Sequence, residues 1–422
     1  MPKDNSFSWI LRNVLGPATL NRLWGDGLSR AQDDPVALSR LLLTTRGEVS
    51  GLAIADRVLT LIEGLDDDGF AALCIALRDQ FEVDTDAIIA ATSAVKAKAP
   101  AALKTLQDAA EPPRQELFRR LNAAPRGTAR LVEFRRRLLL TLRKDPSLAP
   151  IDTDMRHLLR SWFNRGFLVP ARIDWQTPAA VLEKIIAYEA VHAIDTWDDL
   201  RQRVASPDRR CFAFFYPALP DEPLIFVEVA LTKGLASAIH DILDMPRPVL
   251  PPEEADSAIF YSISNCQAGL AGVSFGAFLI KQVAGDLKSE LPGLRMFSTL
   301  SPVPGLHRWT EAQGLKPETL AKDANALLGA AADYLLTAKD TAGRPLDPVA
   351  RFHLGNGAEL HRLNAGADLS PKGLAQSHGL MVNYLYDLDK VETRHEAFAA
   401  SGEIASARAV RSRLTTKGAT TA

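Results

Sequence analysis

Residues 258–305 decide the fold that we expect for the second half of the chain, and they read AIFYSISNCQAGLAGVSFGAFLIKQVAGDLKSELPGLRMFSTLSPVPG. An apolar, β-rich run, Ala258 to Ser264, leads into a glycine-bearing turn, Gln267 to Gly272. A helical pattern follows from Phe275 to Leu287, and a second β-rich run, Met296 to Leu300, ends in Ser301-Pro302-Val303-Pro304-Gly305. A strand, a glycine loop and a helix in this order point backbone N–H groups at a phosphate or a developing oxyanion. The stretch therefore predicts a site for a phosphate-bearing acyl substrate.

β-rich runs alternate with helical patterns on both sides of this stretch, from Val169-Pro170 onwards. The expected strands are Cys211 to Tyr216, Pro223 to Leu231, Ala258 to Ser264, Met296 to Leu300 and Leu380 to Leu388. The expected helices are Pro178 to Glu189, Thr196 to Val204, Phe275 to Leu287, Pro317 to Ala332 and Asp347 to Leu363. The segment Pro217 to Asp221 suits a hairpin turn between the first two strands. We therefore expect an α+β domain with a mixed sheet.

The first part of the chain, from Phe7 to Phe167, has the three- and four-residue apolar spacing of consecutive helices. The expected helices are Val36 to Leu43, Ala55 to Leu65, Gly69 to Leu77, Ala87 to Leu106, Glu116 to Leu121, Thr128 to Leu142 and Met155 to Phe163. The segment Arg126 to Arg143 contains six arginines. It is either an anion-binding face or, as we prefer, the solvated side of an amphipathic helix with Leu131, Phe134, Leu138 and Leu142 inward.

Composition excludes several classes of protein. Of the 422 residues, 47% are hydrophobic and 24% charged, and the formal net charge is −2, so no global field recruits nucleic acid or an anionic membrane. No apolar run approaches the roughly 18 residues of a membrane span. Cys74, Cys211 and Cys266 form no CxxC pair, which suits a reducing compartment. The N-terminal residues do not resemble a secretory signal, so we expect a cytoplasmic protein.

The glycine turn allows two interpretations of about equal weight. In Gln267-x-Gly269-x-x-Gly272 the glycines provide either positive φ angles or close approach of the backbone to a pyrophosphate. The dinucleotide fingerprint fails here because the leading glycine is absent. Cys266, directly before the turn, is more simply a small buried hydrophobe than a nucleophile.

Ser301 and His353 are the candidate catalytic residues. Two prolines after Ser301 restrict the backbone and remove two N–H donors, so the loop is rigid. It is either a structural turn or a segment that positions Ser301 for catalysis. A serine needs a partner within hydrogen-bond reach to act as acid or base. His353 lies in the segment Arg351 to Ala358, RFHLGNGA. The histidines of this chain lack zinc-ligand spacing, so we expect no metal site.

At these residues the chain resembles the malonyl-CoA decarboxylase family. The matching segments are LEKIIAYEAVHAIDTWDDLRQRV (182–204), EPLIFVEVALT (222–232), FYSISNCQAGLAGVSFGAFLIKQV (260–283), FSTLSPVPG (297–305), DPVARFHLGNGAELHRLN (347–364) and GLMVNYLYDL (379–388). The pair FSTLSPVPG and ARFHLGNGA is highly specific, and the likeness covers most of the chain.

The resemblance implies a helical oligomerisation domain (residues 1–168) and a GNAT-type N-acetyltransferase-like catalytic domain (residues 169–422). It implies catalytic roles for Ser301, His353 and Tyr386. The CoA-binding residues implied by the same likeness are Gln267, Gly269, Gly272, Phe275 and Gly276. Some family members carry a glutamate where this chain has Ser274, so the role of that carboxylate is absent here or filled differently.

The family reaction converts malonyl-CoA to acetyl-CoA and CO2 through a thioester enolate, and the resemblance implies protonation by a Ser/His pair. CoA is part of the substrate, and no metal or redox cofactor is expected. The resemblance also implies a homo-oligomer, a dimer or tetramer, with no nucleic-acid or membrane partner. We keep three alternatives open: an acyl-CoA-dependent acyltransferase, a CoA-thioester hydrolase, which lacks the G-x-S-x-G elbow, and a helical scaffold with an inactive acyl-CoA domain. The lead interpretation requires Ser301 and His353 to converge in space.

Overall fold

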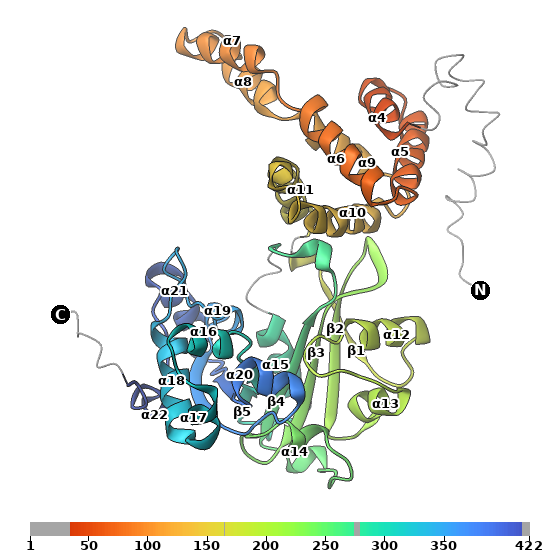
Figure 1. The fold of residues 1–422 in the computed structure, drawn as a ribbon. Helices are drawn as coiled ribbons and strands as arrows, with labels where there is room; N and C mark the ends of the chain where they lie inside the picture. Colours follow the sequence, from red (N-terminus) through yellow and green to blue (C-terminus); the bar gives the residue numbers. More distant parts are fainter. Residues whose placement is uncertain (1–33, 164, 274–278, 416–422) are drawn as a thin grey trace. The chain divides into compact units, whose positions relative to one another are not determined.

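The structure is a computed structural model that describes residues 34–163, 165–273 and 279–415 (Figure 1). The chain divides into two compact units. The first unit comprises residues 1–167 together with 216–220 and 267–274, and the second comprises residues 168–215, 221–266 and 275–422. The glycine turn, which the sequence placed in the catalytic domain, therefore belongs to the first unit.

The first unit is helical, as predicted. Its helices are α4 (Pro35–Thr44), α5 (Glu48–Glu63), α6 (Asp67–Gln80), α7 (Thr85–Lys96), α8 (Ala102–Ala110), α9 (Pro113–Asn122), α10 (Gly127–Leu142) and α11 (Ala149–Trp162). The rings of Phe70 and Phe118 pack on Phe134 of α10, with centroids 5.1 and 5.7 Å away. Such tilted aromatic pairs add to the free energy gained by burying their area. The apolar side of α10 thus forms part of the core.

One expected helix of this unit is wrong. Ala87 to Leu106 was predicted as a single helix, but the chain forms α7 and α8 with a break between them. Lys98 and Ala101 have φ angles of 55° and 58°, the left-handed region that helices do not use. Pro100 lies between them and disfavours the helical region for the residue before it. The alanine-rich composition concealed this turn.

The second unit contains an eight-stranded mixed sheet within its described residues. The strands are β1 (Val169–Ile173), β2 (Arg209–Tyr216), β3 (Leu219–Thr232), β4 (Ser257–Asn265), β5 (Met296–Thr299), β6 (Ser301–Pro302), β7 (Glu359–Asn364) and β8 (Met381–Leu385). The order is β1-β2-β3-β4-β5-β8-β6, and β7 pairs with β8. Strands β4 and β5 run parallel, whereas β5, β6 and β7 each pair with β8 antiparallel. The predicted fold class, helices followed by an α+β mixed-sheet domain, is confirmed.

Helices cover this sheet. They are α12 (Ala179–Tyr188), α13 (Trp197–Ala205), α14 (His240–Leu243), α15 (Leu279–Glu290), α16 (Leu306–Ala312), α17 (Pro317–Lys322), α18 (Ala324–Thr337), α19 (Pro348–Gly355), α20 (Pro371–Ser377), α21 (Val391–Ser401) and α22 (Arg408–Arg411). Helices α12 and α13 lie beside β1 to β3 in Figure 1. Their Ile185 and Leu200 share a core cluster with Ala213 of β2 and Phe226 of β3. The predicted hairpin between β2 and β3 is present, since the two strands are neighbours separated by two residues.

Three expectations for this unit need correction. The segment Asp347 to Leu363 is not one helix, because α19 ends at Gly355 and β7 follows. Gly357 has a φ of 79°, and a Cβ there would overlap the carbonyl oxygen of Val391, so the chain turns at a residue that only glycine fits. The segment Pro317 to Ala332 forms two helices, α17 and α18, with Asp323 capping the second. The edge strand β1 was not predicted, and the first residues of the expected helix Phe275 to Leu287 lie outside the described residues.

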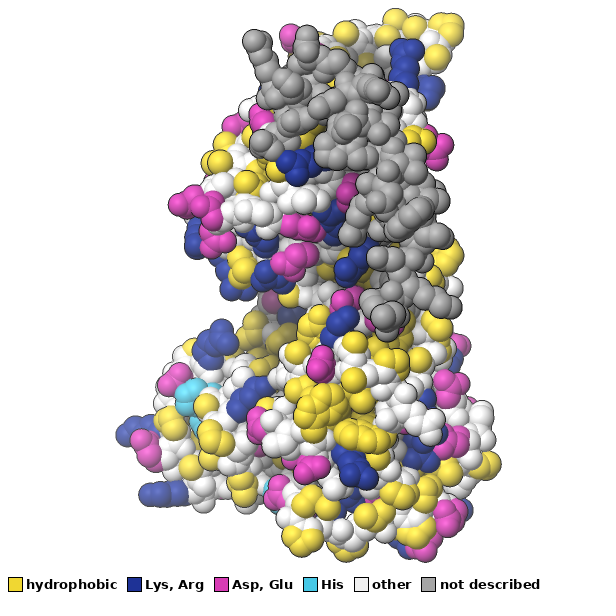
Figure 2. Space-filling model, turned by 90° about the vertical axis from the view of Figure 1, so that its right-hand side faces the viewer, with side chains coloured by type: hydrophobic (Ala, Val, Ile, Leu, Met, Phe, Trp, Pro, Cys, Tyr) yellow, Lys and Arg dark blue, Asp and Glu magenta, His cyan; other side chains and the backbone are white. Residues whose placement is uncertain are grey.

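Two expectations from the composition concern membrane spans and surface charge. In the part of the chain that the structure describes, no helix has the length and apolar character needed to cross a bilayer. On the face drawn in Figure 2, acidic and basic side chains lie interspersed. A mixed surface of this kind produces no strong field of one sign.

Candidate active site

The sheet and helix α19 together bring the candidate side chains Ser301, Tyr386 and His353 to one face of the sheet. Side chains alternate along a strand, so Val382 and Tyr384 of β8 and Tyr386, just beyond its end, share a face. Ser301 pairs directly with Val382 across the β6–β8 ladder, which puts its hydroxyl on that face too. Helix α19 brings His353 to the same place from 52 residues further along the chain.

Ser301, His353 and Tyr386 form one hydrogen-bonded series. The Oγ of Ser301 lies 3.0 Å from Nε2 of His353, and Nδ1 of His353 lies 2.8 Å from the Oη of Tyr386. The three side chains are 6%, 3% and 2% exposed. The convergence of Ser301 and His353 that the sequence required is present. Their catalytic roles, and that of Tyr386, remain predictions.

The direction of the hydrogen bonds follows from a fourth residue. Ser301 Oγ donates to the hydroxyl oxygen of Thr299 at 2.8 Å. Its oxygen then accepts from Nε2–H of His353, and Nδ1 accepts from the hydroxyl of Tyr386; we assign this tautomer from the network. Burial lowers the pKa of His353 to about 3 and raises that of Tyr386 well above its usual range. The resting series is therefore a chain of neutral donors.

Thr299 and Tyr384 are site residues that the sequence reasoning missed. The ring of Tyr384 stacks on that of His353, with centroids 4.6 Å apart and planes 25° apart. Its Oη is buried and has no hydrogen-bond partner among the described residues. The signal was available: Thr299 precedes Ser301 by two residues and Tyr384 precedes Tyr386 by two, and in strands such residues share a face.

This arrangement suits proton delivery in a dry site. The Ser301 hydroxyl is a donor backed by the Nε2–H of His353, and Tyr386 and Tyr384 hold the imidazole by one hydrogen bond and one stacked ring. Among the described residues, the hydrogen-bond partners found for the side chains of Ser301, His353 and Tyr386 include no carboxylate. A base that is to activate Ser301 as a nucleophile normally has such an orienting group. The geometry favours an acid over a nucleophile.

Tyr386→Phe is expected to lower kcat by about tenfold or more, because Nδ1 of His353 would lose its donor inside a buried site. Steady-state kinetics with the acyl-CoA substrate checks this. Tyr261→Phe is the matched control: Tyr261 is equally buried, but its hydroxyl has no partner among the described residues and it packs with Leu300, on the opposite face. Equal kcat values for Tyr386→Phe and wild type would contradict the assigned network.

Two family models, one for the N-terminal and one for the C-terminal domain of the same protein family, match this chain. Residues 166–325 and 315–422 match the malonyl-CoA decarboxylase C-terminal domain. Residues 81–163 match the malonyl-CoA decarboxylase N-terminal domain. The chain belongs to the malonyl-CoA decarboxylase family.

Relatives of known name agree with this membership. The malonyl-CoA decarboxylase of Anser anser anser, named as mitochondrial, is 36% identical over 337 residues, which cover 68% of this chain and 66% of that protein. The chain thus spans just under two thirds of that relative. The crystal structure of malonyl-CoA decarboxylase from Rhodopseudomonas palustris is 51% identical with a TM-score of 0.86, covering 90% of this chain and 99% of that one. The corresponding structure from Agrobacterium vitis is 49% identical with a TM-score of 0.85, covering 91% and 100%.

In this malonyl-CoA decarboxylase family member, Gln267, Gly269 and Gly272 belong to the first unit and the series around Ser301 belongs to the second. Gly269 packs against α10: a Cβ there would overlap the carbonyl oxygen of Val132 and lie 2.8 Å from its carbonyl carbon. Gly272 has a φ of 74°, a backbone conformation that favours glycine over other residues. Ser274, Phe275 and Gly276 lie outside the described residues. The CoA-binding role of the turn remains a prediction.

The arginine-rich helix α10 has the amphipathic character that we preferred, but one of its arginines is tied to this turn. Arg135 is buried, and its guanidinium donates to the carbonyl oxygens of Gly269 and Ala271 at 2.7 and 2.8 Å. Its Nε donates to Asp152 at 2.7 Å. Leu131, Phe134 and Leu138 are buried as predicted, and Leu142 is half-buried. Arg126, Arg136 and Arg143 are exposed, so Arg135 is the departure from the predicted solvated side. Arg135 holds a turn rather than a ligand.

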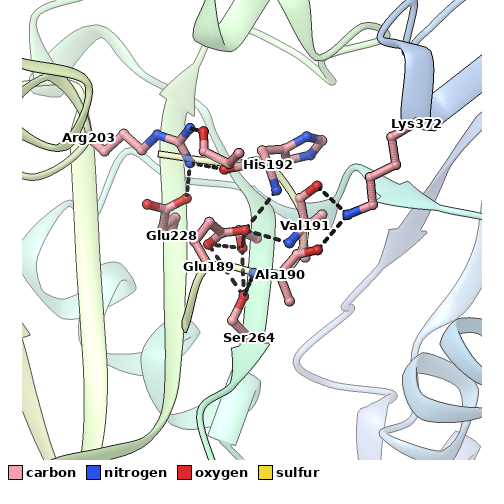
Figure 3. Close-up of polar contacts among 10 residues, drawn as sticks. Glu189, Ala190, Val191, His192, Arg203, Glu228, Ser264 and Lys372 are labelled. Atoms are coloured by element: carbon pink, nitrogen blue, oxygen red, sulfur yellow. Dashed lines mark hydrogen bonds and ion pairs between the residues drawn. The ribbon is translucent and has the colours of Figure 1, made fainter. Parts of the chain in front are cut away.

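A second polar network fixes the connection between α12 and α13 to the sheet (Figure 3). The carboxylate of Glu189 accepts from the backbone N–H groups of Val191 and His192 at 2.7 and 2.8 Å. Ser262 of β4 donates to the same carboxylate at 2.7 Å. Lys372, on α20, donates to the carbonyl oxygens of Ala190 and Val191 at 2.6 and 3.1 Å. The polar groups of Glu189, Ser262 and Lys372 thus have protein partners, which indicates a structural role, whereas Nε2 of His192 is buried and has no partner among the described residues.

Glu228 is a second member of this network with a buried atom that lacks a partner among the described residues. It is fully buried, and its Oε2 accepts from Arg203 at 3.1 Å, while its Oε1 has no partner among the described residues. Burial raises the pKa of Glu228 to about 7, and the nearby charge of Arg203 only partly opposes this. The folded protein therefore binds a proton here more tightly than the unfolded chain does.

Because the pKa of Glu228 is raised on folding, its contribution to stability is present below the unfolded value and is lost as pH rises through about 7. Glu228→Gln removes this loss. We expect the free energy of unfolding of the variant, relative to wild type, to rise by a few kcal/mol between about pH 5 and about pH 8. Urea unfolding at both pH values checks this, with Glu222→Gln, at the half-buried ion pair with Lys184, as control. A difference that does not change with pH would contradict it.

Proposed function

We propose that this chain is a malonyl-CoA decarboxylase that converts malonyl-CoA to acetyl-CoA and CO2. Family membership and relatives of that name support the substrate and the reaction class. The single observation that carries the proposal is the buried series Tyr386–His353–Ser301, which presents a hydroxyl donor backed by a relay.

Decarboxylation requires one proton and no change of oxidation state, so the chemistry calls for no redox cofactor. The bond between the carboxylate carbon and the methylene carbon breaks, CO2 leaves, and the electron pair moves into the thioester as an enolate. The carbon then takes a proton, and the net reaction consumes one proton from water. The chain must therefore hold the carboxylate away from bulk water, stabilise the enolate oxygen and supply that proton.

Ser301 and His353 supply the proton in this proposal. The low pKa of His353 belongs to the site without substrate. An anionic malonyl group beside the ring favours the protonated imidazole, so proton uptake accompanies substrate binding. Nε2–H of His353 then passes a proton to Ser301, and the Ser301 hydroxyl gives its own to the enolate carbon. His353 is left neutral with its remaining proton on Nδ1, which donates to the hydroxyl oxygen of Tyr386, and loss of that proton with new uptake at Nε2 restores the resting tautomer.

One assay tests the proposal. The purified chain is incubated with malonyl-CoA alone, and the products are identified by mass spectrometry. Equimolar acetyl-CoA and CO2 support a decarboxylase. Release of free CoA would indicate a thioester hydrolase, and conversion only after an amine is added would indicate an acyltransferase. Either of these outcomes, or no conversion at all, would reject the proposal.

Further parts of the proposal concern the rest of the chain. The loop Gln267 to Gly276 is proposed to bind CoA, and the helical domain, residues 1–168, to mediate homo-oligomerisation. The three free cysteines are buried and support a reducing, cytoplasmic location. Isothermal titration with CoA, light scattering of the purified chain and cell fractionation test these points separately.

A further inference from the structure

Asp347 begins the helix that carries His353. It is the N-cap of α19, and its Oδ1 accepts from the backbone N–H groups of Val349 and Ala350, both at 2.9 Å. His353 follows on the same helix, one and a half turns later. Because α19 has only eight residues, the cap fixes where the helix starts and therefore where the imidazole lies.

The same carboxylate also holds the loop that begins at Ser301. The hydroxyl of Tyr334 on α18 donates to its Oδ2 at 3.3 Å. Gly305, the last residue of Ser301-Pro302-Val303-Pro304-Gly305, packs against the same oxygen, since its Cβ position lies 3.7 Å from Oδ2 of Asp347. The carboxylate of Asp347 thus caps the helix that carries His353 and contacts the loop that begins at Ser301, directly at Gly305 and through the hydroxyl of Tyr334.

The fit around this carboxylate leaves little freedom. A Cβ on Gly305 would overlap the hydroxyl of Tyr334 and lie 3.2 Å from its Cζ. The Tyr334 ring packs on Trp309 of α16, with centroids 5.4 Å apart. Asp347 has no exposed surface, and the hydrogen bonds to its carboxylate among the described residues come from neutral N–H and O–H groups. Burying a carboxylate among neutral donors alone costs folding free energy. Its position between the two segments suggests that it serves to hold them together.

We infer that Asp347 is a positioning residue of the proposed decarboxylase: its carboxylate ties the Ser301 loop to the His353 helix and so holds the two side chains 3.0 Å apart. The inference rests on the proposed function. Asp347 does not touch the reacting atoms, and it acts through the geometry of the Ser301–His353 pair.

Asp347→Asn tests this directly. Asparagine keeps an oxygen to cap α19, but it turns an NH2 group towards the hydroxyl of Tyr334, which is itself a donor, and against the tightly packed Gly305. We expect kcat to fall by about 100-fold, as a displacement near 1 Å between reacting groups produces. KM for malonyl-CoA should stay within about threefold, because the carboxylate lies away from the substrate.

Asp323→Asn is the matched control. Asp323 caps α18 in the same way, with its Oδ1 accepting from Asn325 and Ala326 at 2.9 and 3.1 Å, but it is exposed and its helix carries no proposed catalytic residue. We expect its kcat to stay within about twofold of wild type. The same substitution at two aspartate caps then separates loss of a cap from loss of the link to Ser301.

A rescue experiment covers the case in which Asp347→Asn does not fold. Gly305→Ala forces a methyl group onto the Tyr334 hydroxyl and should lower kcat by at least about tenfold. Tyr334→Phe in the same chain removes that hydroxyl and should restore part of the loss, since the nearest remaining atom is then 3.2 Å away. The kcat values are measured well below the melting temperature of each variant. If Gly305→Ala causes only a general loss of stability, its melting temperature falls and Tyr334→Phe does not restore kcat.

The outcomes separate the two proposals. If wild type makes acetyl-CoA and folded Asp347→Asn retains wild-type kcat, the inference on Asp347 is overturned and the proposed function stands. The same holds if Gly305→Ala is fully active. If wild type makes no acetyl-CoA, the proposed function fails and the inference falls with it. A fall in kcat at Asp347 and Gly305, with KM retained and with rescue by Tyr334→Phe, supports both.

Discussion

Ser301→Ala is expected to lower the turnover of malonyl-CoA by at least about 100-fold, with little change in CoA binding. In the proposed mechanism the Ser301 hydroxyl gives the proton to the enolate carbon. It stands at the end of the hydrogen-bonded series that begins at Tyr386. Alanine leaves the backbone of β6 intact, because the Ser301–Val382 pairing does not use the side chain. Steady-state decarboxylation assays measure kcat, and titration with CoA measures binding.

His353→Asn is expected to have an effect of the same size, since it removes the group that replaces the proton on Ser301. In the double variant the losses should not add, because the two residues act as one unit. Ser377→Ala is the control: Ser377 is an equally buried serine of the same unit, but its hydroxyl bonds to the carbonyl oxygens of Gly373 and Leu380. Near-normal turnover in both single variants would remove Ser301 and His353 from the mechanism.

The sequence was a good guide to these two residues because each stands in a rigid local context. Pro302 and Pro304 fix the backbone after Ser301, and Asp347-Pro348 marks the start of a helix that leads to His353. What the sequence could not show is the carboxylate link between the two segments. Asp347 reads locally as an ordinary N-cap, and its second oxygen has a use only once the chain has folded.

Long-range packing also explains the errors. Asp347 to Leu363 has the composition of a helix as far as Gly355, and the apolar spacing continues into a segment that pairs with β8 instead. The positive φ of Gly357 decides the change, but a glycine near a helix end does not reveal it without its neighbour, the backbone of Val391. Pairing with a strand some 20 residues further on overrode local propensity.

Gly269 shows the same limit in a more instructive way. A glycine between a strand and a helix admits a pyrophosphate, a positive φ or another backbone, and composition cannot distinguish these. The structure places the carbonyl of Val132 where a Cβ would be. It also directs Arg135 at the carbonyl oxygen of Gly269. Close packing of α10 therefore accounts for this glycine without a ligand.

Gly269→Ala is accordingly expected to lower the free energy of unfolding by about 3 kcal/mol or more, a large effect for one methyl group. The overlap is with backbone atoms of a buried helix, which cannot rotate away as a side chain does. Gly285→Ala is the matched control, since Gly285 lies within α15 with no atom within 4 Å of its Cβ position. Helix propensity predicts that this change is neutral or stabilises by up to about 1 kcal/mol.

Urea unfolding of both variants, with CoA titrations beside it, decides which physical reason holds at position 269. Loss of stability with CoA affinity retained in the folded fraction would mean that Gly269 serves the packing of α10, and that any pyrophosphate contact uses other residues of the loop. Unchanged stability with weakened CoA binding would reverse this and restore the phosphate interpretation. The two outcomes are separable because packing acts on the unliganded protein, whereas a ligand contact contributes free energy only when CoA is present.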